Sequence, residues 1–101
     1  MEEYKMEDDA KKKQSDKKSF DNMQVKVLNI KDGLKTYQDV HCIRINHQSE
    51  KLIIMKDYMP IIGEVNGEVI IEMKDETIKL SNIIGYYMNY QNQFNLFLKE
   101  E

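Results

Sequence analysis

The fold class is read most directly from ten residues, EVNGEVIIEM at positions 64–73. The pair Asn66-Gly67 favours a type I′ turn, because both central residues of that turn need a positive φ. Val69, Ile71 and Met73 then follow at every second position, which is the period of a half-buried β-strand. The stretch therefore predicts a hairpin tip at Asn66-Gly67 that leads into a strand.

The same pattern extends outward from this stretch in both directions. Asp32-Gly33 is a second turn signal, and residues 74–77 form a polar break. Further alternating or apolar runs lie at 23–27, 41–45, 52–55, 78–80 and 94–98. Short runs separated by turn signals are typical of all-β sandwiches and barrels. We therefore expect residues 22–101 to form a single all-β sandwich of about eight to ten short strands.

The first 21 residues have a different composition. Residues 1–20 contain six acidic residues and six lysines, and they are poor in apolar side chains. Such a segment cannot bury enough apolar surface to offset the entropy of ordering it. Pairs such as Glu7 with Lys11 have the spacing that supports a helix. Residues 1–21 are therefore interpreted as a charged arm, disordered or transiently helical, with an arm that docks on a partner as the alternative.

Length, charge and cysteine content limit the class of protein. The chain has 101 residues, a net charge of −3 and one cysteine, Cys42. This length suits one domain, and the acidic balance argues against nucleic acid as a partner. One cysteine cannot form an internal disulfide, which favours a reducing, cytoplasmic location. No apolar run approaches the roughly 20 residues of a membrane span, and we expect no signal peptide.

The residues that carry chemistry are sparse. His41, Cys42 and His47 are the only soft metal donors, and a zinc site needs about four ligands. The glycines are isolated, so no phosphate-binding loop is present. We expect His41, which shares a strand face with Ile43 and Ile45, to be a packed or an edge histidine. The sequence predicts no catalytic residue, no cofactor and no metal site.

A surplus of apolar residues points to a partner surface. Pro60 is surrounded by Tyr58, Met59, Ile61 and Ile62, and Gly85 is followed by Tyr86, Tyr87, Met88 and Tyr90. A strand with one buried face buries only one of two neighbours. Tyr and Met are enriched where proteins bind each other. The surplus side chains are therefore candidates for a protein interface.

Two stretches resemble the N-terminal β-sandwich of the epsilon subunit of F-type ATP synthases. The first is Leu52-Ile53-Ile54-Met55 followed by Tyr58-Met59-Pro60-Ile61-Ile62, which is similar to a strand leading to a His-Ala-Pro-Leu-Leu type motif. The second is Ile84-Gly85-Tyr86-Tyr87, similar to a Gly-Gly-Phe-Leu stretch. The resemblance covers about residues 22–98. The chain departs from the family at several positions, including Asp57, Tyr58 and Asn89, where the family has a buried apolar residue in place of Asn89. The family's C-terminal helical hairpin would begin after about Leu98, and we expect none here.

The resemblance implies a non-catalytic subunit of the central stalk of a rotary F-type ATPase. Such a subunit binds the gamma subunit and helps couple rotation to ATP synthesis or hydrolysis, next to the alpha and beta subunits. It implies gamma contacts at Tyr58 and Met59, with a second contact at Asn29 and Ile30. It also implies that the turn at Glu50 and Lys51 approaches the ring of c subunits, at the cytoplasmic face of the membrane.

Two alternatives remain open. The chain has fourteen lysines and one arginine, with many Ile and Asn, which indicates an AT-rich genome. Some mollicutes have such genomes and carry specialised F-type-like ATPases, one of them linked to gliding motility. An epsilon-like subunit of such an ATPase, without a c ring, is the first alternative. An unrelated β-sandwich adaptor is the second.

Overall fold

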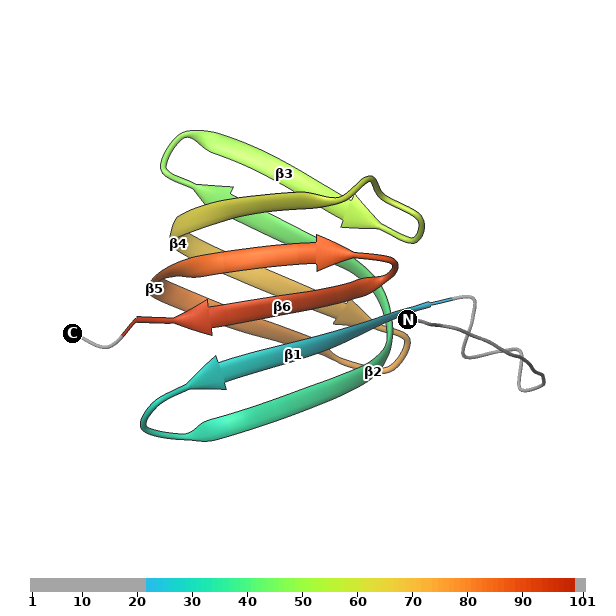
Figure 1. Cartoon of the computed structure of the whole chain (residues 1–101), viewed down its shortest axis with the longest axis horizontal. Helices are drawn as coiled ribbons and strands as arrows, with labels where there is room; N and C mark the ends of the chain where they lie inside the picture. The colour runs from blue at the N-terminus through green and yellow to red at the C-terminus, as the bar shows by residue number, and fades with distance from the viewer. Residues whose placement is uncertain (1–21, 100–101) are drawn as a thin grey trace, which may run out of the picture.

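A computed structural model describes residues 22–99 of the chain. All of its regular structure is β, in the order β1 (Met23–Asn29), β2 (Gly33–His47), β3 (Glu50–Met55), β4 (Ile61–Met73), β5 (Thr77–Tyr90) and β6 (Gln93–Leu98) (Figure 1). The all-β prediction is therefore confirmed. The predicted arm at residues 1–21 lies outside the described residues.

The predicted sandwich of eight to ten short strands is corrected to a five-strand barrel with one additional strand. Five strands form a closed ring in the order β1-β6-β5-β4-β2, because β2 pairs again with β1. The sixth strand, β3, pairs with β2 outside the ring. The sequence pattern divided three long strands, which have 15, 13 and 14 residues in β2, β4 and β5. Bulges bend these strands where the pattern is interrupted, so no turn is needed there.

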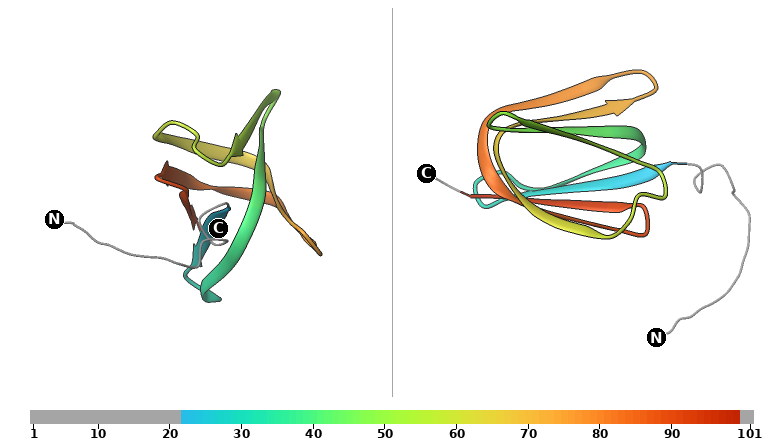
Figure 2. Two further views of the ribbon diagram at one scale, coloured as in Figure 1. Left: turned by 90° about the vertical axis from the view of Figure 1, so that its right-hand side faces the viewer. Right: turned by 90° about the horizontal axis from the view of Figure 1, so that it is seen from above.

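The longest strand, β2, connects the two sides of the barrel. Residues 33–40 pair with β1, and residues 40–47 pair with β4 on one edge and β3 on the other. Figure 1 shows β2 leaving the side of β1 and passing behind the barrel to lie beside β3, and Figure 2 shows its curvature. Asp39 has a φ of 54° at this bend. The pairing with β4 shifts between Val40 and Cys42.

This bend overturns the expected position of His41. Val40 is fully buried and takes the place in the core that the alternation predicted for His41. His41 itself is exposed. A bulge inserts one extra residue, so the side chains before it change faces relative to those after it. Ile43 and Ile45 are buried as predicted.

The predicted hairpin tip at Asn66-Gly67 is wrong. Both residues lie inside β4, and the pairing of β4 with β5 shifts between Gly67 and Glu68. Asn82, with a φ of 54°, is the extra residue on the β5 side of this bulge. A Cβ at Gly67 would collide with the main-chain oxygen of Asn46. Gly67 therefore permits two strands to approach closely, and it does not form a turn.

The type I′ signature occurs at another position. Tyr90 pairs with Gln93, and the two residues between them, Gln91 and Asn92, have φ values of 50° and 62°. The turn signal at Asp32-Gly33 is confirmed, because it lies between β1 and β2 and Gly33 has a φ of 82°.

The core fills the inside of the barrel. Met23, Val25 and Val27 of β1 are buried, as their alternation predicted. The rings of Tyr87 and Phe94 stack with centroids 5.6 Å apart. The other buried apolar residues are Val40, Cys42, Ile43, Ile45, Ile54, Val65, Val69, Ile71 and Leu96. This packing fixes which residues of each strand face outward.

Candidate partner interface

The second half of β5 has apolar side chains on both faces. Tyr87 is buried, whereas Tyr86, Met88 and Tyr90 point outward. Tyr86 is 50% exposed and Tyr90 is 54% exposed. The sequence predicted that members of this cluster would remain outside the core, and their alternation confirms it.

Strand register extends this cluster across the barrel. Tyr86 lies opposite Phe97 of β6, Phe97 lies opposite Leu28 of β1, and Leu28 lies opposite Leu34 of β2. On the next outward row, Ile62 of β4 lies opposite Met88. We call this set the outer apolar face; it consists of Leu28, Leu34, Ile62, Tyr86, Met88 and Phe97.

The outer apolar face is large for a solvent-exposed apolar patch. Its six side chains are between 39% and 75% exposed. Large apolar side chains have roughly 150–250 Å² of surface each, so the exposed patch amounts to about 500 Å². The largest patch on a typical monomer is about 300–600 Å² and is often functional. The face therefore has the size of an interaction site.

Few charges interrupt this face. Its outward rows include Lys26, Glu64 and Lys99, and the Nζ atom of Lys99 lies 5.9 Å from the centre of the Tyr86 ring. The opposite side of the barrel is different. There Arg44 forms an ion pair with Glu72 at 2.5 Å, and Lys79 forms one with Glu68 at 3.9 Å. The two sides therefore differ in polarity, and the outer apolar face is the side suited to a protein partner.

Tyr58 and Met59 lie in the loop between β3 and β4. Tyr58 is half-buried and packs against the core, and its main-chain N–H donates to the oxygen of Met55 at 3.1 Å. Met59 is 66% exposed. Met59 comes three residues before Ile62, so it lies near one corner of the outer apolar face.

A pair of side-chain hydrogen bonds fixes this loop. The main-chain N–H of Asp57 donates to Oδ1 of Asn92 at 2.6 Å. The side-chain amide of Asn92 donates to Oδ1 of Asp57 at 3.1 Å. Asp57 has a φ of 65°. The loop that carries Tyr58 and Met59 is thus held against the turn between β5 and β6.

Asn29 and Ile30 lie at the turn between β1 and β2. Oδ1 of Asn29 accepts from the main-chain N–H of Lys31 at 2.8 Å, which stabilises the turn. Ile30 is 79% exposed and follows Leu28 beyond the end of β1. Ile30 and Met59 thus lie near opposite ends of the outer apolar face.

Glu50 and Lys51 begin β3, after a two-residue turn. Both are exposed, and they line a cleft of about 480 Å³ between β3 and the first half of β4. The structure therefore does not gather the six predicted residues into one cluster. Asn29, Ile30, Glu50 and Lys51 belong to the β1–β2 and β2–β3 turns and their margins, and Tyr58 and Met59 belong to the loop between β3 and β4. Figure 1 shows these two turns at one end of the barrel and that loop at the other.

Three members of the outer apolar face were missed by the sequence analysis, namely Leu28, Leu34 and Phe97. Leu28 and Phe97 each stand directly beside an inward-facing apolar residue. The rule that a strand buries only one of two neighbours would have identified them. Strand register alone shows that they join Tyr86 and Met88, because it brings distant segments together.

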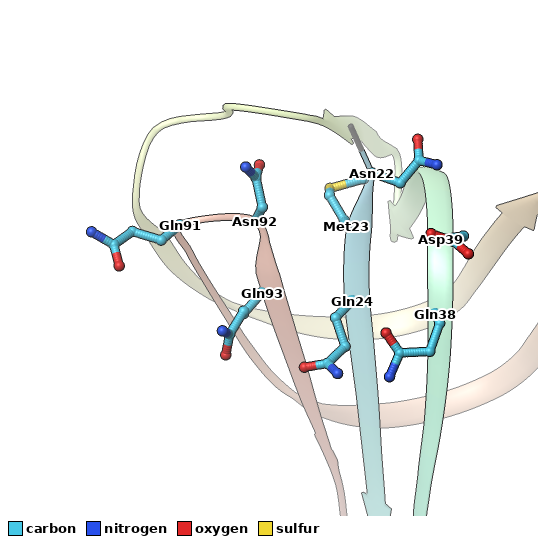
Figure 3. A pocket seen from close by; sticks show the side chains of 8 residues that line it. All are labelled: Asn22, Met23, Gln24, Gln38, Asp39, Gln91, Asn92 and Gln93. Carbon is cyan, nitrogen blue, oxygen red and sulfur yellow. The ribbon is translucent and has the colours of Figure 1, made fainter. Parts of the chain in front are cut away.

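A polar cavity of about 380 Å³ lies beside the turn between β5 and β6. Figure 3 shows its lining, which is dominated by carboxamides: Asn22, Gln24, Gln38, Gln91, Asn92 and Gln93, with Met23 and Asp39. Carboxamides donate and accept hydrogen bonds but do not titrate near neutral pH. This lining can bind polar groups, but it holds no acid–base pair.

The nucleophile and metal candidates are equally limited within residues 22–99. Cys42 is buried, and burial raises the pKa of its thiol, with the Glu72 carboxylate raising it further. The reactive thiolate is therefore disfavoured at neutral pH. No group of three or more His, Cys, Asp or Glu side chains in this range could hold a metal ion. The same range contains no helix of the length and hydrophobicity that a membrane span requires.

Comparison with known proteins identifies the fold. No family model and no curated protein matches the chain. The fold is similar to a chain in the cryo-EM structure of the Tetrahymena thermophila mitochondrial ATP synthase, central stalk and c ring, with a TM-score of 0.61 and 13% identity. The match covers 78% of this chain and 64% of that chain. The barrel thus resembles a component of an ATP synthase central stalk, and it spans less than two thirds of that neighbour.

Proposed function

We propose that this chain is a non-catalytic, epsilon-like subunit of a rotary F-type ATPase. In this proposal it binds the gamma-like subunit of the central stalk through the outer apolar face. The exposed row Tyr86–Phe97–Leu28–Leu34 is the observation that carries the proposal. The similarity to a central-stalk structure supports the assignment to a rotary ATPase.

The geometry of the surface suits a stalk subunit. A standard protein interface buries about 800 Å² on each partner. The outer apolar face supplies about 500 Å² of that, and Ile30, Met59 and Tyr90 extend it at its margins. The two gamma contacts inferred from the family resemblance, at Asn29-Ile30 and Tyr58-Met59, thus border one surface. The subunit would work at the cytoplasmic face of the membrane.

Co-purification from the native organism tests the proposal. A tagged full-length chain is expected to bring down ATPase alpha, beta and gamma-like subunits in fixed ratio.

The double substitution Met59→Ala with Tyr58→Ala should weaken this assembly by at least about tenfold. Because Tyr58 also packs against the core, the single substitution Met59→Ala distinguishes a loss of binding from a loss of fold stability. Removal of residues 1–20 should cost less, because screened charges contribute little. Recovery of the chain without any ATPase subunit would refute the proposal.

The same purification separates the standard synthase from a specialised ATPase. Glu50 and Lys51, both exposed at the start of β3, lie where the family approaches its c ring. A c subunit in the purified complex favours the synthase. Alpha- and beta-like subunits without a c subunit favour the specialised F-type-like ATPase, in which these charged residues would face solvent.

A further inference from the structure

A second surface lies on the side of the barrel where β3 is the last strand. β3 pairs with β2 alone, and the pairing is regular from His47 opposite Glu50 to Cys42 opposite Met55. Residues 61–65 of β4 also have no strand partner on their far edge, because β2 pairs only with residues 67–73 of that strand. Two strand edges with free main-chain groups are therefore present on this side of the described chain.

The edge of β3 lacks the features that normally prevent strand pairing. Natural edge strands carry a proline, a bulge or a central charge. The residues Leu52-Ile53-Ile54-Met55 contain no charge and no proline, and no bulge interrupts their pairing with β2. Ile53 is 45% exposed and Met55 is 57% exposed. This edge is therefore competent to pair with another strand.

A cleft beside this edge leaves core side chains open to solvent. Its volume is about 480 Å³, and Ile45, Leu52 and Tyr87 line it together with Glu50, Lys51 and Glu64. A partner that paired with β3 would also cover these apolar side chains. The cleft and the bare edge are thus two separate reasons for a partner on this side.

We propose that the partner is a second copy of this chain, related by a two-fold axis through Ile53. An antiparallel pair of β3 strands centred there places Leu52 opposite Ile54 of the second copy. It sets the central apolar residues of the two strands against each other, with Lys51 opposite Met55. Shifting the register by two residues in the N-terminal direction would set Glu50 against Ile54, and shifting it in the C-terminal direction would leave only Ile53, Ile54 and Met55 paired. The register centred on Ile53 therefore pairs the most apolar residues of the strand. A two-fold dimer requires an interface that is complementary to itself.

The dimer should be weak and reversible. A six-residue strand is about 20 Å long, so the contact falls at the low end of specific interfaces, near 1,000 Å² in total. Sedimentation of the full chain over a concentration series is expected to show dimers with a dissociation constant in the micromolar range. A chain that stays monomeric at millimolar concentration overturns the inference.

Substitution tests the location of the contact. Ile53→Glu sets two carboxylates against each other across the axis, which should raise the dissociation constant at least about tenfold. Thr77→Glu is the matched control, because Thr77 is exposed on the same outward side but lies on β5. Circular dichroism verifies that both variants are folded. A dimer that survives Ile53→Glu and is lost in Phe97→Asp would move the contact to the outer apolar face and overturn the inference.

Cysteine cross-linking provides a second readout that does not depend on affinity. In a Cys42→Ala background, Ile53→Cys places two thiols opposite each other, where Cβ atoms are about 4.5–5.5 Å apart. Mild oxidation should link this variant as a dimer and leave Thr77→Cys monomeric. Equal cross-linking of the two variants would contradict the proposed axis. This dimer is independent of the proposed function, so either one can fail without the other.

Discussion

At the scale of single residues, Asn89 is a buried polar residue that lowers the stability of the fold. It is 1% exposed, and neither its Nδ2 nor its Oδ1 has a hydrogen-bond partner in the described chain. A buried amide without partners costs about 1–3 kcal/mol. The family resemblance already marked this position as one where an apolar residue is usual.

Asn89→Val is therefore expected to stabilise the fold by about 1–2 kcal/mol, measured by urea denaturation. Asn46→Val is the matched control. The side-chain amide of Asn46 donates to Oε2 of Glu68 at 2.9 Å, so this substitution should destabilise by about 1 kcal/mol. If both substitutions destabilised the protein, Asn89 would have a partner that the fold does not reveal.

Cys42 makes the stability of the fold depend on pH in the alkaline range. Its pKa is raised above the ordinary value of 9.0, first by burial and then by Glu72. Above that ordinary value the unfolded chain loses the thiol proton while the folded chain keeps it. The unfolded state then binds fewer protons, so stability falls as pH rises. The contribution of Cys42 is complete below about pH 9 and is lost as pH rises toward the folded pKa.

Chemical denaturation between about pH 8 and pH 10 measures this effect. The free energy of unfolding should decrease across the range in the wild type and decrease less in Cys42→Ala. Tyr87, whose pKa is raised above 10.0 by burial and by Tyr58, contributes only at higher pH. Tyr87→Phe should therefore leave the slope below pH 10 unchanged, and identical slopes in the wild type and Cys42→Ala would contradict the account.

At the scale of elements, the bulge where β4 meets β5 and β2 is central to closing the barrel. Gly67 lies against the main-chain oxygen of Asn46, with no room for a Cβ. Gly67→Ala should destabilise by about 2 kcal/mol or more, because two strands must separate. Gly33→Ala is the control, since Gly33 has a φ of 82° but no atom near its missing Cβ. That change should cost only about 1 kcal/mol of strain. Urea denaturation showing the reverse order would show that the close approach does not matter.

The loop between β3 and β4 depends on Asn92 for its position. Asn92→Gly keeps the left-handed backbone, for which glycine carries no penalty, and removes the amide that pairs with Asp57. Loss of about 1 kcal/mol of local stability corresponds to about fivefold faster opening. Amide hydrogen exchange at Asp57 and Tyr58 should accelerate by that factor. Exchange at Val25, in the core strand β1, serves as the internal control and should not change.

The approximate positions of the strands could be predicted from the sequence. Where each strand ends, and which strands pair, could not. Alternation at Met23, Val25 and Val27 depends on one buried face, and it predicted the core correctly. Asn66-Gly67 misled because glycine serves a close approach as well as a turn. The Gln91-Asn92 turn contains no glycine and so gave no signal. The alternation predicted that some residues of the cluster Tyr86-Tyr87-Met88 would lie outside the core. The position of Tyr86 opposite Phe97 depends on pairing between distant segments and could not be predicted.

At the scale of the whole molecule, the barrel has two unlike sides. One side carries cross-strand ion pairs such as Arg44 with Glu72, which satisfy each other. The other side carries the outer apolar face, where Tyr86, Phe97 and Leu28 are between 42% and 50% exposed. Burial of these side chains on binding would be favourable by the hydrophobic effect, and a few aromatic anchors usually supply most of an interface's energy. The proposed binding to a gamma-like subunit therefore involves the side of the barrel that carries the outer apolar face.

The affinity of the chain for the purified gamma-like subunit of the same organism tests this claim most directly. Isothermal titration should show that Phe97→Ala, at the centre of the face, weakens binding by at least about tenfold. Ile70→Ala, at a half-buried position on the opposite side, should leave the affinity unchanged. Tight binding that Phe97→Ala does not weaken, or the absence of binding by the wild-type chain, would contradict the account.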